Sequence, residues 1–246
     1  MNSVPLKSID HITSLSLFQQ AQDIARHIPQ WHKAGTYTYS VPQERQDVHV
    51  DIHTNSFNDD YWVARASDFH EFSPKTRAHV YQLLDKYVVG SLSVLEESHT
   101  HYEMGYIQEM YDFKVHQHEL AEAVPGFDSI TYLAELYYHL QFPLKKRKFC
   151  NLVHILRAHD GKSAYIISLA VDPSVIPGNP QEPDFVQGRY TSVEYVEFDP
   201  KSSDVKWYMT TCSDAGGSVP QWLAKLTINS VVAKDVHSFL AWANTK

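Results

Sequence analysis

Cysteine and glycine are both scarce in this chain, which has 2 cysteines and 9 glycines among its 246 residues. Cys150 and Cys212 cannot build the disulfide framework of a small secreted protein, so we expect a reducing, cytoplasmic location. No apolar run approaches the ~20 residues of a membrane-spanning helix. Residues 1–11 also lack the apolar core of a secretory signal, which fits the same expectation.

Positive charge is also in short supply. The 21 Lys and Arg side chains are outnumbered by 29 Asp and Glu, which gives a formal net charge of −8. A chain of this balance is repelled by a phosphate backbone, and so the composition argues against nucleic acid as a partner.

The common enzyme motifs are missing as well. The sequence has no HExxH zinc motif, no Gly-x-Ser-x-Gly elbow, no Walker loop and no GxGxxG fingerprint. Nothing in it indicates that either cysteine is a thiolate. We therefore predict no enzymatic activity, with a Ser-His-Asp triad assembled only in space as the alternative.

The first half of the chain mixes helical and strand patterns. Apolar residues recur at helical spacing between Thr13, a capping residue, and Pro29. Ser73 and Pro74 form a helix-start signature, and the helix they begin should end at Gly90. A further helix is predicted over 97–111. Short strands are expected at 36–41, 47–53 and 61–69.

From residue 130 the pattern changes to alternating and β-branched runs separated by turns, which is typical of an antiparallel meander. These runs are 131–141, 149–158, 163–171, 189–199 and 205–211. After Pro220 a long amphipathic helix extends to Ala243. A sheet with one long helix laid across it predicts an α+β fold, and residues 1–246 are expected to form a single domain.

His116 and His118, followed by Glu122, are the densest group of potential metal ligands. On a strand the two imidazoles would share one face. A cupin-type site would also need a preceding glycine, where this chain has Met110, and a second histidine motif. Because the chain has 15 histidines, chance neighbours are expected. We interpret these as solvated loop side chains and predict neither a metal nor a cofactor.

Lys145, Lys146, Arg147 and Lys148 form the one concentrated basic run. One interpretation is a solvated hairpin tip, and another is a nuclear address. The third is a docking patch for an anionic membrane surface, where each cation contributes about 1 kcal/mol.

Three stretches, in this order, resemble the START family, the steroidogenic-acute-regulatory-related lipid-transfer domains. Residues 137–149 resemble its strand, Pro-containing turn and Arg-x-Phe opening of the next strand. The strands of 149–211 follow. Residues 214–223, Asp-Ala-Gly-Gly-Ser-Val-Pro-Gln-Trp-Leu, are similar to the family's entry to its last helix. The resemblance is strongest over 130–243, and 62–67 are similar to a START-like subgroup found mainly in fungi.

The resemblance implies a helix-grip fold of the Bet v1-like superfamily. In this fold a curved antiparallel sheet wraps a long C-terminal helix and encloses one lipid in a tunnel. The resemblance also implies a lid turn before the last helix, formed by Asp214, Gly216, Gly217, Pro220 and Trp222.

One departure from the family is informative. Some members bury an Arg paired with a carboxylate on the neighbouring strand, where this chain has Val153 and Ala134. Losing both partners together avoids an unpaired buried charge and predicts a mostly apolar tunnel with phenol and amide groups. The candidate lining residues, each of which could equally be plain core, are Leu136, Tyr138, Asn151, Val153, Ile155, Arg157, Trp207, Val232, Val236 and Phe239.

The predicted function is binding of one lipid (a sterol, phospholipid or sphingolipid) and its transfer between membranes. Such a protein would be cytoplasmic and would touch anionic membrane surfaces transiently. Two alternatives remain: a hydrolase or cyclase on the same scaffold, and a non-catalytic regulatory or scaffold protein.

Overall fold

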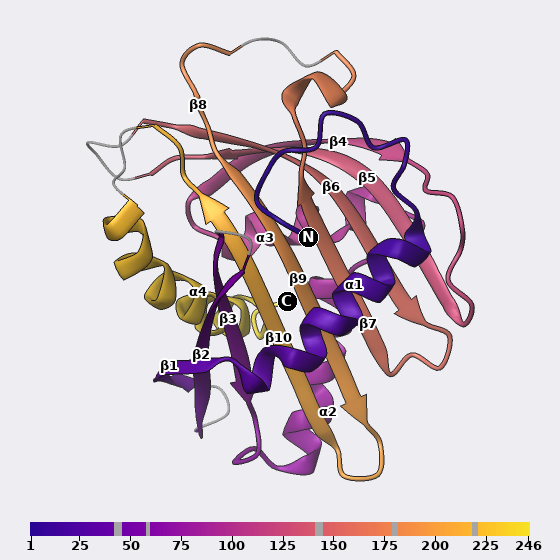
Figure 1. Ribbon diagram of the computed structural model, residues 1–246. Coiled ribbons are helices and arrows are strands. Elements are labelled where there is room, and N and C mark those ends of the chain that lie inside the picture. Colours follow the sequence, from indigo (N-terminus) through magenta and orange to yellow (C-terminus); the bar gives the residue numbers. More distant parts are fainter. Residues whose placement is uncertain (42–45, 58–59, 141–144, 179–181, 218–220) are drawn as a thin grey trace.

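One antiparallel sheet organises the computed structural model, which describes residues 1–41, 46–57, 60–140, 145–178, 182–217 and 221–246 (Figure 1). The strand order is β1-β2-β3-β10-β9-β7-β6-β5-β4, and the short β8 pairs in parallel with β6. The strands are β1 (His32–Val41), β2 (Gln46–Phe57), β3 (Asp60–Asp68), β4 (Met110–His118), β5 (Phe127–Tyr138), β6 (Arg147–Ala158), β7 (Ser163–Ala170), β8 (Val186–Gln187), β9 (Arg189–Asp199) and β10 (Asp204–Asp214).

Two helices begin where the sequence predicts, because their caps form. The Thr13 hydroxyl accepts a hydrogen bond from the Ser16 amide at 3.2 Å, and the Ser73 hydroxyl accepts one from the Thr76 amide at 3.1 Å. The helices are α1 (Ser14–His27), α2 (Pro74–Leu83), α3 (His99–Tyr106) and α4 (Gln221–Ala243), with the π-helix η2 (Leu84–Val89) and the 3-10 turns η1 (Ile28–Gln30), η3 (Leu95–Glu97) and η4 (Pro173–Val175).

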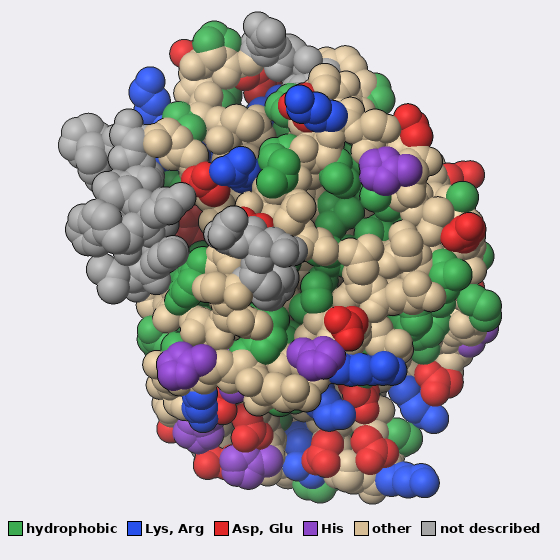
Figure 2. All heavy atoms as spheres, in the orientation of Figure 1, with side chains coloured by type: hydrophobic (Ala, Val, Ile, Leu, Met, Phe, Trp, Pro, Cys, Tyr) green, Lys and Arg blue, Asp and Glu red, His purple; other side chains and the backbone are tan. Residues whose placement is uncertain are grey.

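The sheet has a core on each face. Helix α1 crosses what we call the outer face, against β7, β9 and β10 (Figure 1). Helix α4 packs on the opposite, inner face, where it contacts β1, β2, β3 and α3. On the face seen in Figure 2, acidic and basic side chains are interspersed rather than segregated. The predicted α+β arrangement of a large sheet and a long C-terminal helix is confirmed.

Residues 97–111 are where the sequence prediction is wrong. Tyr102, Tyr106 and Met110 recur every fourth residue and so imitate a helix. The chain instead leaves α3 at Ile107, which has extended angles of φ −88° and ψ 102°, and enters the edge strand β4. His116 and His118 therefore lie on a strand, not in the predicted loop.

Candidate ligand-binding site

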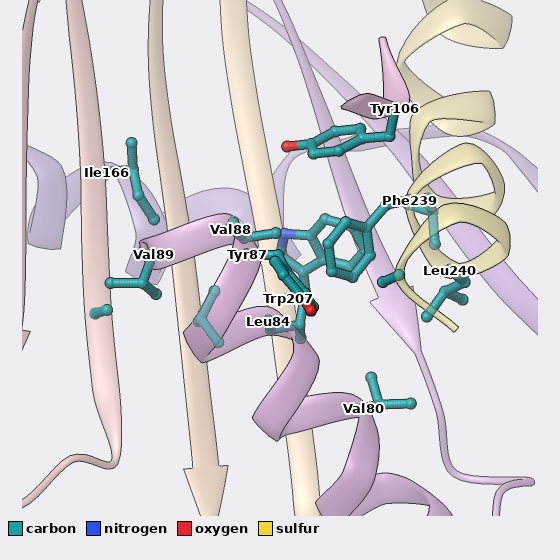
Figure 3. Close-up of a cluster of buried hydrophobic side chains, with 14 of the residues drawn as sticks. Val80, Leu84, Tyr87, Val88, Val89, Tyr106, Ile166, Trp207, Phe239 and Leu240 are labelled. Atoms are coloured by element: carbon teal, nitrogen blue, oxygen red, sulfur yellow. The ribbon is translucent and has the colours of Figure 1, made fainter. Parts of the chain in front are cut away.

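Aromatic side chains from three elements meet on the inner face (Figure 3). The ring of Phe239, on α4, lies 5.1 Å from that of Trp207 on β10 and 5.3 Å from that of Tyr106 on α3, centroid to centroid. Both contacts are edge-on, which is the favoured geometry of such pairs. The cluster fixes the C-terminal half of α4 against the sheet.

A buried ion pair lies beside this cluster. Arg65 Nη2 on β3 donates to Glu194 Oε1 on β9 at 2.8 Å, and the indole nitrogen of Trp207 donates to the same oxygen. The guanidinium also stacks 4.1 Å from the centre of the Trp207 ring. Strand register explains the meeting, because Met209 on β10 is paired with Arg65 on one side and with Glu194 on the other.

Four buried polar atoms of the inner face have no hydrogen-bond partner in the described part of the protein. These atoms are Arg65 Nε and Nη1, Ser67 Oγ and Asn151 Oδ1. Ser67 is two positions from Arg65 and so lies on the same face of β3. Polar atoms of this kind are uncommon in native proteins, and each calls for a partner.

Three further polar side chains, Tyr138, Tyr190 and Asp235, are partly accessible. Burial raises the pKa of both phenols well above 10, with the Glu103 carboxylate adding to the effect. Burial likewise raises the pKa of Asp235 to about 7, against an opposing effect of Arg65. The two phenols are therefore uncharged hydrogen-bonding groups at neutral pH.

Most of the predicted lining residues lie on this inner face. Leu136, Val153, Ile155, Val232, Val236, Phe239 and Trp207 are fully buried, and Tyr138 is partly accessible. The Asn151 amide donates to the Tyr190 carbonyl at 2.9 Å.

Arg157 holds a helix rather than standing free on the inner face. Its Nε lies 2.9 Å from Asp85 Oδ1, and its Nη2 donates to the carbonyls of Asp85 and Gly90. The side chain thereby ties the π-helix η2 to β6. Residues with π-type hydrogen bonds commonly lie at functional sites.

The predicted lid turn follows β10. Asp214 accepts hydrogen bonds from the Gly216 amide at 2.8 Å and from Arg189 at 2.9 Å. Gly216 and Gly217 have φ of 67° and 68°, a region that favours glycine. Pro220 and the side chain of Trp222 lie outside the described residues.

The structure divides the basic run. Arg147 is buried and donates to the Ala215 carbonyl at 2.6 Å, so it fixes the lid turn. Lys148 is only 4% exposed and contacts Glu135 at 2.5 Å and Glu182 at 3.2 Å. The prediction of four docking cations is therefore wrong for these two residues, because they begin β6 and each is buried on one face of the sheet, Arg147 against the lid turn and Lys148 against the two carboxylates. Lys145 and Lys146 remain exposed.

The histidine pair shows no metal geometry. His116 Nε2 lies 3.5 Å from Glu135 Oε1. Across the described part of the chain, no group of three or more His, Cys, Asp or Glu side chains is placed to hold a metal ion. Among the same residues, no helix has the length and apolarity to cross a membrane.

The arrangement of the sheet and α4 is that of START domains. Human StAR-related lipid transfer protein 5 aligns with a TM-score of 0.57 at 14% identity, over 94% of this chain and 98% of its own. Human STARD10 aligns at 0.58 and 12%, over 92% and 79%. The lipid transfer and protein localization domain of human StarD13 (DLC2) aligns at 0.52 and 16%, over 91% and 96%.

The family itself is shown by sequence. A family model described as "Protein of unknown function (DUF3074)" matches residues 62–243, and the chain belongs to that family. The match begins at Trp62, within the 62–67 segment that the sequence analysis singled out. No curated protein matches the chain.

Proposed function

We propose that this protein binds one lipid-sized hydrophobic molecule between the inner face of its sheet and α4, and carries it between membranes. The observation that supports this most is the START-like fold, in which a long helix lies over the inner face of a large sheet beside the partly accessible side chains of Tyr138, Tyr190 and Asp235. Covering about 400 Å² of apolar ligand surface contributes about 10 kcal/mol before entropic costs, which is ample for tight binding.

Ligand transfer also requires contact with a membrane. Of the basic run, Lys145 and Lys146 are exposed beside the lid turn that Arg147 holds. We assign docking on an anionic surface to these two lysines. Cys150 and Cys212 are both buried and no disulfide joins them, which fits work in the reducing cytoplasm.

Occupancy of the site tests the proposal directly. Delipidated protein is incubated with vesicles of mixed lipids and examined by native mass spectrometry. We expect one lipid per chain, unchanged in covalent structure. Conversion of the bound lipid would instead support the hydrolase or cyclase, and no bound lipid would support the scaffold.

A pair of α4 variants ties the occupancy to the inner face. Ile228 is one turn before Val232 and partly accessible, whereas Val231, the residue just before Val232, is 53% exposed to solvent. Ile228→Trp should fill the space and lower lipid loading several-fold. The same substitution at Val231 should leave loading unchanged. Equal loading of both variants would mean that α4 does not wall the site.

A further inference from the structure

The unpartnered polar atoms of β3 are costly unless something binds them. A buried donor or acceptor without a partner is destabilising, and Arg65 Nε, Arg65 Nη1 and Ser67 Oγ are three such atoms on one strand. Replacing Ser67 with an apolar residue of similar size would therefore stabilise an empty protein, whereas Arg65 is also needed to pair with Glu194. The presence of these polar atoms on the inner face indicates that a bound molecule supplies their hydrogen-bond partner in the functional state.

Glu194 does not serve as the missing partner of Arg65 Nε and Nη1. Glu194 already occupies Arg65 Nη2 and the Trp207 indole nitrogen, and Trp207 covers one face of the guanidinium. The remaining nitrogens are held in place by these contacts, with little freedom to turn toward another acceptor. Donors fixed in this way are suited to binding an oxygen atom at low entropic cost.

The charges around Arg65 select the kind of oxygen. Glu194 pairs with Arg65 at 2.8 Å, and Glu103 lies 3.3 Å from His99. Each of these cations is therefore already matched by a carboxylate. A phosphate or carboxylate placed here would be an additional buried charge without a counter-ion, whereas a neutral hydroxyl or carbonyl would accept hydrogen bonds without a net charge to bury.

We propose that Arg65 and Ser67 form the polar end of the ligand site and bind an uncharged oxygen, a hydroxyl or carbonyl, on an otherwise apolar molecule. This inference rests on the proposed function and names the ligand chemistry of that site. It places the polar end on β3, not at the β5 and β6 positions of Ala134 and Val153, where the resemblance led us to look for it.

Two variants separate a ligand role from a role in folding. In Ser67→Ala the unpartnered hydroxyl is removed, so the delipidated protein should melt at the same or a higher temperature while neutral-lipid affinity falls about five-fold. Thr211 also faces inward, but its hydroxyl already donates to the Thr191 carbonyl at 3.3 Å. Thr211→Val should therefore lower the melting temperature and leave affinity unchanged. Arg65→Lys, which keeps the positive charge beside Glu194, should weaken binding ten-fold or more.

The lipid chemistry is tested with phosphatidylcholine vesicles that contain cholesterol, dioleoylglycerol and oleic acid. Native mass spectrometry should find cholesterol or dioleoylglycerol bound, and phosphatidylcholine and oleate absent. Loading of phosphatidylcholine or oleate, or full loading of Ser67→Ala and Arg65→Lys, would overturn the inference while the proposed function stands. If no lipid of any kind loads, both fail.

Discussion

Gly216 is the residue at which the lid turn is least tolerant of change. A Cβ at this position would lie 2.4 Å from the Gln187 carbonyl oxygen, which belongs to the backbone and cannot rotate away. At Gly217 the nearest atom is a Val186 methyl at 3.2 Å, which can shift. Both positions have positive φ, so alanine is strained at each by about 1 kcal/mol.

We therefore expect Gly216→Ala to lower the free energy of unfolding by clearly more than Gly217→Ala, which should cost about 1 kcal/mol. Urea titration of the two variants measures the difference. Gly217→Val, whose larger side chain meets Val186, should fall between them and lower lipid loading as well. Equal stability of the two alanine variants would mean that β8 does not pack on this turn.

For single residues, the sequence predicted the side of the sheet on which a side chain lies better than it predicted which side chains pair. Alternation correctly assigned Leu136, Val153 and Ile155 to one side of the sheet. It could not join Arg65 to Glu194, which are 129 positions apart and meet only through the register of β10. A signal was available, because an Arg in the apolar run of 61–69 is unusual on a strand buried on both faces.

At the scale of elements, the basic run 145–148 is divided between two kinds of environment. Arg147 and Lys148 are buried at the start of β6, where Arg147 contacts the lid turn and Lys148 contacts Glu135 and Glu182. Lys145 and Lys146 point outward, with the Lys146 ammonium 5.0 Å from the ring of Tyr111. The outward pair is thus the part of the run available to a membrane.

Changing Lys145 and Lys146 together to Gln should weaken binding to phosphatidylserine vesicles at low salt by about 2 kcal/mol, roughly 30-fold, and less at high salt. Vesicle co-sedimentation over a salt series measures this. The control changes Lys162 and Lys201, in the turns after β6 and β9, and so removes the same net charge elsewhere. If the two double variants behave alike, overall charge and not the β5–β6 connection governs binding.

Elements with a cap or a breaker at their ends were predictable, and β4 was not. Thr13, Ser73 and Pro74 fix helix starts through local hydrogen bonds, which any sequence carries in itself. The end of α3 and the pairing of β4 with β5 depend on tertiary contacts, such as Val115 opposite Ala134. The aromatic residues of 102–111 suit either state, so local pattern alone could not choose.

At the scale of the whole molecule, three buried ionisable groups shape stability against pH. Burial lowers the pKa of His154 to about 4. The two ring nitrogens of this histidine lie 2.8 Å from the hydroxyls of Ser14 and Thr131. Burial would also lower the pKa of His99, but the Glu103 carboxylate outweighs this and raises it to about 9. The third group is Asp235, with a pKa of about 7.

The three groups change the stability of the fold in different directions as pH rises. His154 contributes stability above pH 6.5 that is lost as pH falls to 4, whereas Asp235 contributes stability at pH 4 that is lost as pH rises to 7. The two largely offset each other. His99 contributes stability below pH 6.5 that is lost as pH rises to 9.

We therefore expect the free energy of unfolding to change little from pH 4.5 to 6.5 and then to fall by about 3 kcal/mol by pH 9. Urea unfolding at these three values measures it. Asp235→Asn should uncover the His154 effect as a rise between pH 4.5 and 6.5, and His99→Gln should flatten the alkaline fall. A decline that persists unchanged in His99→Gln would assign it to other groups.

The order of strands has a consequence for how the chain is made. Strands β1, β2 and β3 are adjacent in sequence and can pair as soon as they emerge from a ribosome, but the other edge of β3 pairs with β10. At typical rates of synthesis, roughly 7 to 27 seconds separate the appearance of residue 68 from that of residue 204. For that interval Val63 and Ala64 belong to an open sheet edge, a template for association with other nascent chains. Newly made copies of this protein should therefore depend on chaperones until the C-terminal third is complete.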